Sequence, residues 1–546
     1  MGGWLQHLPI LPIVLPLLAG AALLLIDDGR YKTRTAVAIA SVIAQLAVAI
    51  ALLAVGAGVF PDLWPTGVAV YKLGGWEAPF GIVLVADRLS AVMLTLAAVL
   101  AIPSLVYASA RWDKIGAHFH TLFQLLLMGL NGAFLTGDLF NLFVFFEVLL
   151  AASYGLVLHG SGARRVKAGL HYIVVNLAAS LLFLLGAALI YGVTGTLNMA
   201  DLAMRVPRLD ADGRLLFDVG VALLGVVFLI KAGVWPLNFW LQNSYSAAAA
   251  PVAAIFSIMT KVGIYAVLRI GTLLSLAGAP APFDGNTLWI VGIATLFFGA
   301  IAMLNEHQPQ RLAACCVIVS AGTLLSALGL GGPAVVGAAL FYLISSALAT
   351  GAFFMLGEMI ERSQQFGAGM LAVSLDYFGI DEAPDPNAPE EVVGVAIPAA
   401  LAFLGLGFIS CALLITGLPP LSGFIAKFSL LSATLGDASL DAVPPAAWAL
   451  VVGVLGSGMI GIIALSRMGT RIFWNSGEWR VPHLRVIEAG PVVLLVMLCV
   501  GLTMAAGPVA KYLDATGLAL YQPHSYIDAV LAGQQASVTA VAGGGR

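Results

Sequence analysis

Charged side chains are scarce in this sequence. Only 10% of its 546 residues are Asp, Glu, Lys or Arg, whereas 60% are hydrophobic, and the mean hydropathy is +1.00. Soluble domains carry about 25% charged residues. The composition therefore excludes an ordinary soluble protein and indicates a chain that is surrounded largely by lipid.

Cysteine is equally scarce. All four cysteines, Cys315, Cys316, Cys411 and Cys499, fall inside apolar runs, without a C-x-x-C pair or a cluster of histidines nearby. This pattern predicts small buried core residues and neither a metal site nor a bound redox cofactor. The net charge of −3 gives no reason to expect nucleic-acid binding.

Long apolar runs dominate the chain, and each is long enough to approach the roughly 20 residues of a transmembrane helix. Fourteen such runs are present, at 5–26, 35–55, 84–107, 119–136, 138–158, 168–192, 216–241, 251–274, 288–304, 312–330, 334–360, 392–431, 446–465 and 489–506. The period-2 alternation of a membrane β-barrel is absent, so these runs predict helices. The first run lacks the basic flank and cleavage pattern of a signal peptide and is expected to be a retained crossing.

Basic residues in the loops predict the orientation. With the N-terminus outside, the cytoplasmic loops collect Arg30, Lys32, Arg34, Arg111, Lys114, Arg164, Arg165, Lys167, Arg311, Arg362, Arg467, Arg471, Arg480 and Arg485. The other side holds only Lys72, Arg205, Arg208, Arg214, Arg269, Lys511 and Arg546. Both termini are therefore expected outside, with an amphiphilic tail from about Val509. The acidic, proline-rich insertion 361–391 is expected to be a solvated cytoplasmic loop or a docking surface for a partner protein.

Four ionisable residues lie deep inside apolar runs: Glu147, Lys231, Lys261 and Lys427. Each charge at a helix centre costs about 2.5–3.5 kcal/mol on insertion scales, and such residues usually face the interior and mark an ion path. The alternative is a purely stabilising Glu147–Lys231 pair, with the other lysines extended toward the interface.

Prolines interrupt two of these runs. Pro236 follows Lys231, and Pro419 and Pro420 precede Lys427. A proline within a crossing removes a backbone hydrogen bond, so both helices are expected to be broken near mid-membrane. Aligning Pro236 with Pro420 superposes Gly233 on Gly417, which suggests two related halves, and paired broken helices indicate a transport site.

Lysine suits proton transfer. A buried lysine holds its proton when a carboxylate is close and releases it when the carboxylate withdraws. A change in the separation between Glu147 and Lys231 would therefore switch the protonation of Lys231, and a row of lysines would pass the change along the membrane.

Several of these segments resemble a known family. The run 137–147, which includes Asp138 and ends at Glu147, the run 231–240, the segment 251–265 and the run 417–424 are similar to the antiporter-like membrane subunits. This family is shared by respiratory complex I, membrane-bound hydrogenases and the multisubunit Mrp/Pha-type cation/proton antiporters. The resemblance covers about residues 87–471. The Phe-Phe-Glu-Val-Leu-Leu-Ala-Ala-Ser-Tyr end of the fifth crossing and the stretch 345–362 most resemble the D subunit of the Mrp/Pha antiporters.

The resemblance implies an all-α polytopic membrane protein of about 14 transmembrane helices. It implies N-terminal helices at 1–118, a first repeat of helices 4–8 at 119–275, an inverted second repeat of helices 9–13 at 286–466, and a last helix with an external tail at 467–546. Helices 7 and 12 are implied to be broken.

The resemblance also implies roles for the buried charges. Glu147 and Lys231 would form the charge pair of the first half-channel, Lys261 would connect the halves, and Lys427 would exchange protons in the second. The implied protein is a proton-translocating subunit of a Na⁺(K⁺)/H⁺ antiporter, a secondary transporter and not an enzyme. It would lie with other membrane subunits in the bacterial cytoplasmic membrane and hold no cofactor.

The sequence departs from the wider family on helix 11. Where many relatives carry histidines and a lysine, this chain has Tyr342, Ser346 and Thr350, and none of its eight histidines lies mid-membrane. We therefore expect the central relay to depend on hydroxyls, water and lysines. His159 and His171, near the cytoplasmic ends of helices 5 and 6, are expected to be interfacial or to line a proton entrance.

Two other functions stay open at the level of sequence. A subunit of complex I or of a membrane-bound hydrogenase would use the same residues to pump protons with a redox partner. A structural scaffold would carry the buried charges without using them. The sequence shows no oxygen-rich cluster of cation ligands that would favour Na⁺ over K⁺ or the reverse.

Overall fold

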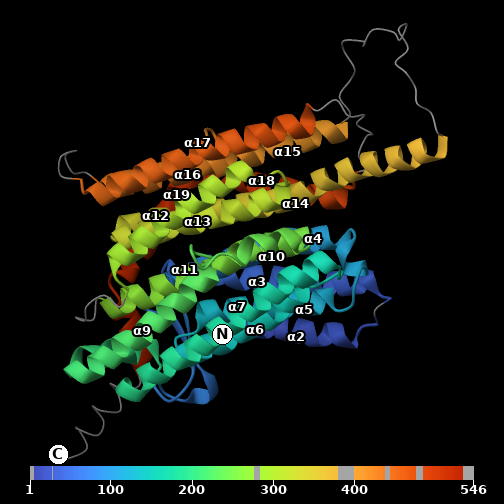
Figure 1. The fold of residues 1–546 in the computed structure, drawn as a ribbon. Helices are drawn as coiled ribbons and strands as arrows, with labels where there is room; N and C mark the ends of the chain where they lie inside the picture. Colours follow the sequence, from blue (N-terminus) through green and yellow to red (C-terminus); the bar gives the residue numbers. More distant parts are fainter. Residues whose placement is uncertain are drawn as a thin grey trace, which may run out of the picture.

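The computed structural model describes residues 5–27, 29–275, 283–378, 399–436, 443–474 and 484–532, with the side chains of 364–378 left out. In these ranges the chain is almost entirely helical (Figure 1). Thirteen of the described helices are long and apolar enough to cross a membrane. The 17-residue helix α5 (Phe119–Leu135) supplies a further crossing, which agrees with the fourteen expected.

The N-terminal half of the bundle is built from α2 to α11. Its crossings are α2 (Leu11–Leu25), α3 (Tyr31–Gly56), α4 (Arg88–Ser109), α5, α6 (Leu139–Val157), α7 (Ala163–Thr194), α9 (Ala211–Ala232) with α10 (Leu241–Ala247), and α11 (Ala250–Ser275). The short helix α8 (Met199–Arg205) and the antiparallel hairpin of β1 (Ala69–Lys72) and β2 (Val83–Ala86) lie between crossings. The sequence patterns did not predict this hairpin.

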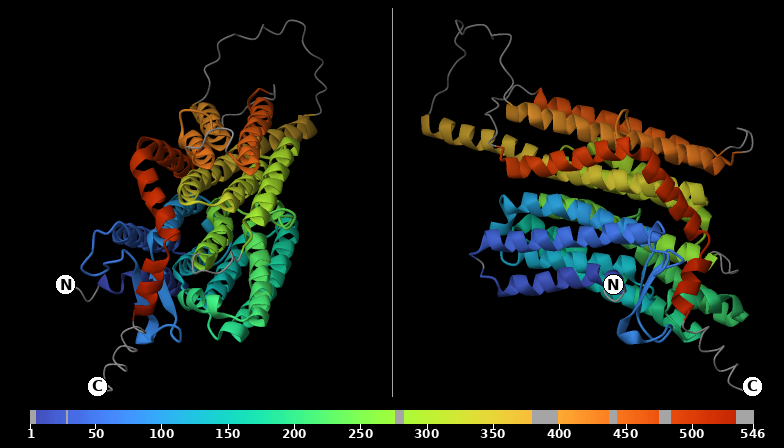
Figure 2. Two further views of the ribbon diagram at one scale, coloured as in Figure 1. Left: turned by 90° about the vertical axis from the view of Figure 1, so that its left-hand side faces the viewer. Right: turned by 180° about the vertical axis from the view of Figure 1, so that it is seen from behind.

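The C-terminal half is built from α12 to α19. It contains α12 (Gly285–Asn305), α13 (Pro309–Leu330), α14 (Pro333–Phe378), α15 (Ala399–Thr416) with α16 (Ser422–Leu435), α17 (Pro445–Phe473), α18 (Val486–Met504) and α19 (Ala506–Leu520). The two halves lie side by side, blue to green against yellow to red, and the red helix α19 crosses back to the N-terminal half (Figure 2).

Aspartate and asparagine side chains fix several helix starts. The carboxylates of Asp87, Asp138 and Asp210 accept hydrogen bonds from the backbone N–H three residues later. Asn198 and Asp284 cap α8 and α12 in the same way. Such caps satisfy backbone donors that have no partner within the helix, so each of these helices begins at its capping residue.

Both predicted helix breaks are present. Helix α9 ends at Ala232, where Gly233 has φ +69°, and helix α15 ends at Thr416, where Gly417 has φ +78°. Glycine adopts this left-handed conformation without steric cost. The two glycines that the alignment superposes therefore end equivalent half-helices, as predicted.

The expected loop at 361–391 is wrong in its first part. Helix α14 continues to Phe378, well past the end of the apolar run at 360. The absence of proline between Glu361 and Phe378 explains the continuation, since the first proline of the insertion is Pro384. The remainder of the insertion, from 379 on, lies outside the described residues.

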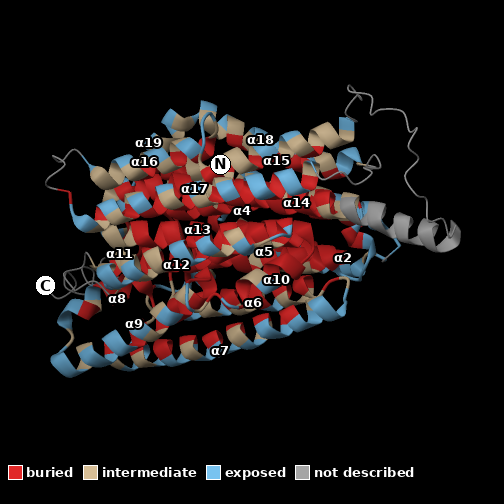
Figure 3. Cartoon of the chain, turned by 45° about the horizontal axis from the view of Figure 1, so that its top comes forward, coloured by how far each residue is buried: buried red, intermediate tan, exposed pale blue. Residues whose placement is uncertain are grey.

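Burial is greatest on the helices at the centre of the bundle. Helix α11 is enclosed along its whole apolar window, and α13 and α14 are mostly buried. Figure 3 shows buried residues gathered in the middle of the molecule, whereas α7 at its edge carries many exposed ones. The enclosed helices are α11, with Lys261, and α14, with the predicted hydroxyls.

Candidate functional site

Lys231 occupies the last turn of α9, directly before the break. Its side chain is 7% exposed, and its Nζ lies 4.9 Å from the ring centroid of Phe146 on α6. Within the described chain, no group lies within hydrogen-bonding distance of this Nζ. The ammonium is therefore held by the electron-rich face of the ring, a cation–π contact.

Glu147, the expected partner of Lys231, binds a different group. The hydroxyl of Ser180 on α7 donates a hydrogen bond to the Glu147 carboxylate. The described part of the chain shows no ion pair between Glu147 and Lys231. Lys231 contacts Phe146, which immediately precedes Glu147 in α6, so a small displacement of α9 against α6 changes the charge separation.

Lys261 lies at the centre of α11 and is 1% exposed. Its Nζ donates a 2.8 Å hydrogen bond to Ser320 Oγ on α13. The Ser320 hydroxyl lies 2.9 Å from Ser346 Oγ on α14. Three side chains from three helices thus form a continuous polar chain in an otherwise apolar interior.

Lys427 lies on α16 and reaches back to the end of α15. Its Nζ donates a 2.8 Å hydrogen bond to the carbonyl oxygen of Thr416. In an intact helix that carbonyl would accept from the N–H of residue 420, but Pro420 has none. Lys427 therefore satisfies a carbonyl that the predicted helix break frees.

Glycines leave room for the Lys427 side chain. A Cβ at Gly417 would lie 2.6 Å from Lys427 Cδ, and one at Gly458 on α17 would lie 3.1 Å from the Thr416 oxygen. A larger residue at either place would displace the lysine or its acceptor.

The polar chain that begins at Lys261 ends in a small cavity that also holds Lys427. This central cavity has a volume of about 30 Å³, which is room for two or so water molecules. The polar residues that line it are Cys316, Ser320, Tyr342, Ser345, Ser346, Thr350, Thr416, Lys427 and Ser457. The structure thus places the three predicted hydroxyl residues of helix 11 around one cavity with Lys427.

Lys231 and Lys261 are separated by a tight helix contact. A Cβ at Gly263 on α11 would lie 2.4 Å from the Phe228 carbonyl oxygen of α9, so the two backbones nearly touch. Among the described residues, no hydrogen bond joins Lys231 to Lys261. The structure therefore brings Lys261 and Lys427 together through hydroxyls and keeps the Glu147–Lys231 region apart from them.

Asp138 and His159 lie outside the central group. Asp138 caps α6 by accepting from Asn141 N at 2.9 Å, and burial raises the pKa of its carboxyl. His159 Nε2 lies 2.8 Å from the Trp112 carbonyl oxygen, and burial lowers the pKa of its imidazole. The ring is therefore neutral at pH 7, with Nε2 as the donor, and it fixes the backbone at Trp112.

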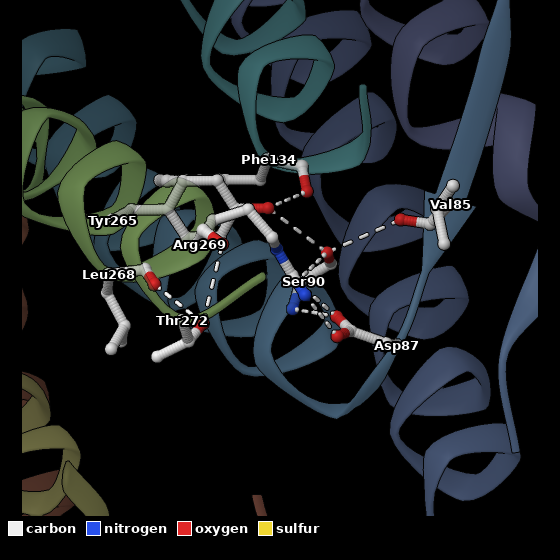
Figure 4. A network of polar contacts seen from close by, with 8 residues as sticks. All are labelled: Val85, Asp87, Ser90, Phe134, Tyr265, Leu268, Arg269 and Thr272. Carbon is white, nitrogen blue, oxygen red and sulfur yellow. Dashed lines mark hydrogen bonds and ion pairs between the residues drawn. The ribbon is translucent and has the colours of Figure 1, made fainter. Parts of the chain in front are cut away.

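Sequence reasoning missed a buried ion pair at the other end of the bundle (Figure 4). Both terminal nitrogens of Arg269 donate to the Asp87 carboxylate, each at 2.6 Å. Burial opposes ionisation of Asp87, but Arg269 holds the pKa of this carboxyl below its usual range. The guanidinium also lies over the rings of Tyr265 and Tyr526. Asp87 and Arg269 each lie within two turns of the end of an apolar run. At such positions a sequence pattern cannot distinguish a buried charge from one at the membrane interface.

A second missed group, Glu358, lies at the opposite end of the bundle on α14. It is 9% exposed, and Arg362 lies near both Glu358 and Glu488. The signal that could have revealed it is its position inside the apolar run, two residues before the end of that run at 360.

Comparison with known proteins identifies the relatives. Residues 136–378 match the family model described as NADH:quinone oxidoreductase/Mrp antiporter, TM. The chain is 50% identical to the D subunit of a probable K⁺/H⁺ antiporter of Rhizobium meliloti (strain 1021), over 98% of this chain and 99% of the relative. It is 33% identical to the D subunit of a Na⁺/H⁺ antiporter of Alkalihalophilus pseudofirmus, over 96% and 100%. A chain of the Mrp complex from Dietzia superposes with a TM-score of 0.79 at 27% identity, covering 96% of this chain and 99% of that one.

Proposed function

Since this chain belongs to the antiporter-like membrane subunits of the NADH:quinone oxidoreductase/Mrp antiporter family, we propose that it is the proton-translocating subunit of a multisubunit monovalent cation/proton antiporter. In this proposal it works as a secondary transporter in the bacterial cytoplasmic membrane, beside other membrane subunits, with both termini outside. The repeats at 119–275 and 286–466 each contribute one half of the proton path.

One observation carries the proposal. The chain from Lys261 through Ser320 to Ser346 ends in the same cavity as Lys427. Hydroxyl groups both donate and accept hydrogen bonds, so each serine can pass a proton from one lysine toward the other. A row of hydrogen-bonded side chains that only stabilised the fold would have no need for a polar cavity at its end.

The first half acts through charge separation in this proposal. Moving Glu147 toward Lys231 stabilises the ammonium, and moving it away favours release of the proton. Because α9 contacts α11 directly at Gly263, a shift of Lys231 is transmitted to the helix of Lys261. Protonation events in the two halves are thereby coupled.

The named relatives favour an antiporter over a redox-driven pump. The 50% identical relative, matched along almost its whole length, is named a probable subunit of a K⁺/H⁺ antiporter. A scaffold without transport function is disfavoured because three buried lysines each contact a specific partner, a costly arrangement in a membrane.

Cation-dependent proton movement in inverted vesicles that carry the intact complex tests the proposal. Addition of Na⁺ or K⁺ should collapse the pH gradient with the wild-type chain and not with Lys231→Ala. Lys231→Arg keeps the charge but cannot release the proton, and it should fail as well. If both variants transport normally at matched expression, Lys231 is a structural charge and the proposal is wrong.

A further inference from the structure

An open cleft of about 330 Å³ lies at the end of the bundle that carries the basic loops. It is bounded by the starts of α7 and α13, by the end of α10 and by the cytoplasmic part of α14. The polar residues that line it are Ser161, Arg164, Arg165, Ser246, Gln310, Glu358 and Glu361. It is separate from the central cavity that holds Lys427.

Glu358 is the buried acid of this cleft. Its two carboxylate oxygens each accept from Trp112 Nε1 at 3.1 Å, and one also accepts from Ala250 N, at the start of α11, at 3.2 Å. Backbone donors at a helix start favour a negative charge. The carboxylate is therefore fixed in place at the N-terminus of α11, the helix that carries Lys261.

Arg362, the basic residue one turn after Glu358, is drawn toward another acid. Arg362 Nη1 lies 2.7 Å from Glu488 Oε1 on α18, whereas its Nε lies 3.8 Å from Glu358. One arginine is thus shared by two carboxylates and lies closer to Glu488. The other charged groups that face this region are Glu361 on α14, Arg164 and Arg165 on α7, and Arg111 after α4. Arg165 is engaged by the Ala247 and His159 carbonyls.

Gln310, the second residue of α13, lines the cleft. It is 5% exposed, and its Nε2 donates to the Phe354 carbonyl oxygen at 2.9 Å. Its Oε1 accepts from no group of the described chain. An orphaned buried acceptor in a polar cleft requires a donor from outside the protein, and water is the donor that fits such a place.

Helix α14 connects the cleft with the central cavity. Tyr342, Ser346, Thr350, Phe354 and Glu358 follow one another at four-residue spacing, and residues so spaced are neighbours on a helix surface. The first three line the central cavity and Glu358 lines the cleft. Thr350 and Glu358 are eight residues apart, about 12 Å along the helix axis, and Phe354 is the only apolar member of the row.

We propose that the Glu358 cleft is the opening through which protons exchange between the cytoplasm and the central cavity, with Phe354 as the apolar barrier between them. Glu358 accepts a proton from water in the cleft and becomes a neutral acid. It then returns the proton to water beyond Phe354 and is again a carboxylate, so no other reactant is needed. This inference rests on the proposed proton-translocating function and adds its cytoplasmic opening.

Transport by the Glu358→Gln variant tests whether Glu358 carries protons. Glutamine can still accept the hydrogen bonds of Trp112 and Ala250 but cannot carry a proton. Positioned acid–base groups raise the rate of proton transfer by about 10²–10⁴-fold. Because water in the cleft can take over part of this role, the rate of cation-driven proton movement should fall by about 10-fold or more. Glu488→Gln is the matched control, since it removes a carboxylate from the same arginine outside the cleft, and it should transport normally. Equal rates for the two variants would overturn the role of Glu358.

Thiol labelling of the intact complex tests the barrier without measuring transport. In inverted vesicles, a water-soluble methanethiosulfonate should label Glu358→Cys but not Thr350→Cys. Adding Phe354→Ala should make Thr350→Cys reactive, with Phe354→Ala alone and the wild-type chain as controls for the four buried cysteines. If Thr350→Cys stays unreactive in the Phe354→Ala background, the proposed route from the cleft past Phe354 is wrong. This conclusion holds even when Lys231→Ala abolishes transport. If Lys231→Ala transports normally while the labelling is as expected, the proposed function fails and the water route stands.

Discussion

At the residue scale, each buried lysine is held by a different kind of partner. Lys231 faces an aromatic ring, Lys261 a hydroxyl and Lys427 a main-chain carbonyl. All three partners accept the charged ammonium without being charged themselves. An anionic partner in direct contact would hold the proton more strongly, so neutral partners suit the proposed role, in which each lysine both takes up and releases a proton.

Gly263 tests how closely the helices of Lys231 and Lys261 must pack. A Cβ there would lie 2.4 Å from the Phe228 oxygen, whereas one at Gly271 of the same helix meets only a ring carbon of Phe283 at 3.4 Å. Gly263→Ala should lower the free energy of unfolding by about 1–3 kcal/mol through overpacking. Gly271→Ala should be neutral or slightly stabilising. Thermal unfolding of the purified complex measures both, and equal stabilities of the two variants would contradict the close contact.

At the scale of helices, prolines create acceptors that other helices use. Pro420 leaves the Thr416 carbonyl to Lys427, as described above. Pro16 within α2 likewise leaves the carbonyl of Pro12 without a partner four residues later, and Asn131 Nδ2 on α5 donates to it at 2.8 Å. The same backbone defect thus fixes two helices together in one place and positions the buried Lys427 in the other.

A double-mutant cycle tests the Pro16 interpretation. Asn131→Ala should destabilise the protein by about 0.6–2 kcal/mol, the range for hydrogen bonds between membrane helices. In a Pro16→Ala background the restored N–H satisfies the Pro12 carbonyl, so the same change should cost clearly less. Unfolding of all four chains in detergent gives the coupling. Strict additivity would show that Asn131 acts through Gln45 alone, to which it also donates.

The helices and their breaks could be predicted from the sequence because they depend on local features. Run length determines a crossing, and Pro236, Pro419 and Pro420 interrupt a helix wherever it lies. The partners of the charges could not be predicted in the same way. Whether Glu147 contacts Lys231 or Ser180 depends on which distant helix covers each side chain, and the same holds for the burial of Glu358 and Arg269. The continuation of α14 to Phe378 did not follow from the acidic composition of this segment, which indicates solvent exposure but does not end a helix.

At the scale of the whole molecule, α11 connects its own N-terminal half with the C-terminal half. Its start is capped by Glu358 of α14, its centre binds Ser320 of α13, and its end is fixed by Asp87 at the start of α4. The segment that follows helix α19 adds Tyr526 over Arg269 at the same end. Both halves and the C-terminal segment therefore meet on the helix that carries Lys261.

The most direct test of this account is cation-driven proton movement by the intact complex with Lys261→Met. The change removes the proposed central proton carrier, preserves side-chain length in an apolar setting and leaves Lys231 and Lys427 in place. Lys511→Met, at an exposed position of α19, is the control. The account predicts an assembled complex that no longer moves protons on addition of Na⁺ or K⁺, with normal transport by the control. Normal transport by Lys261→Met would contradict a proton path that joins the two halves.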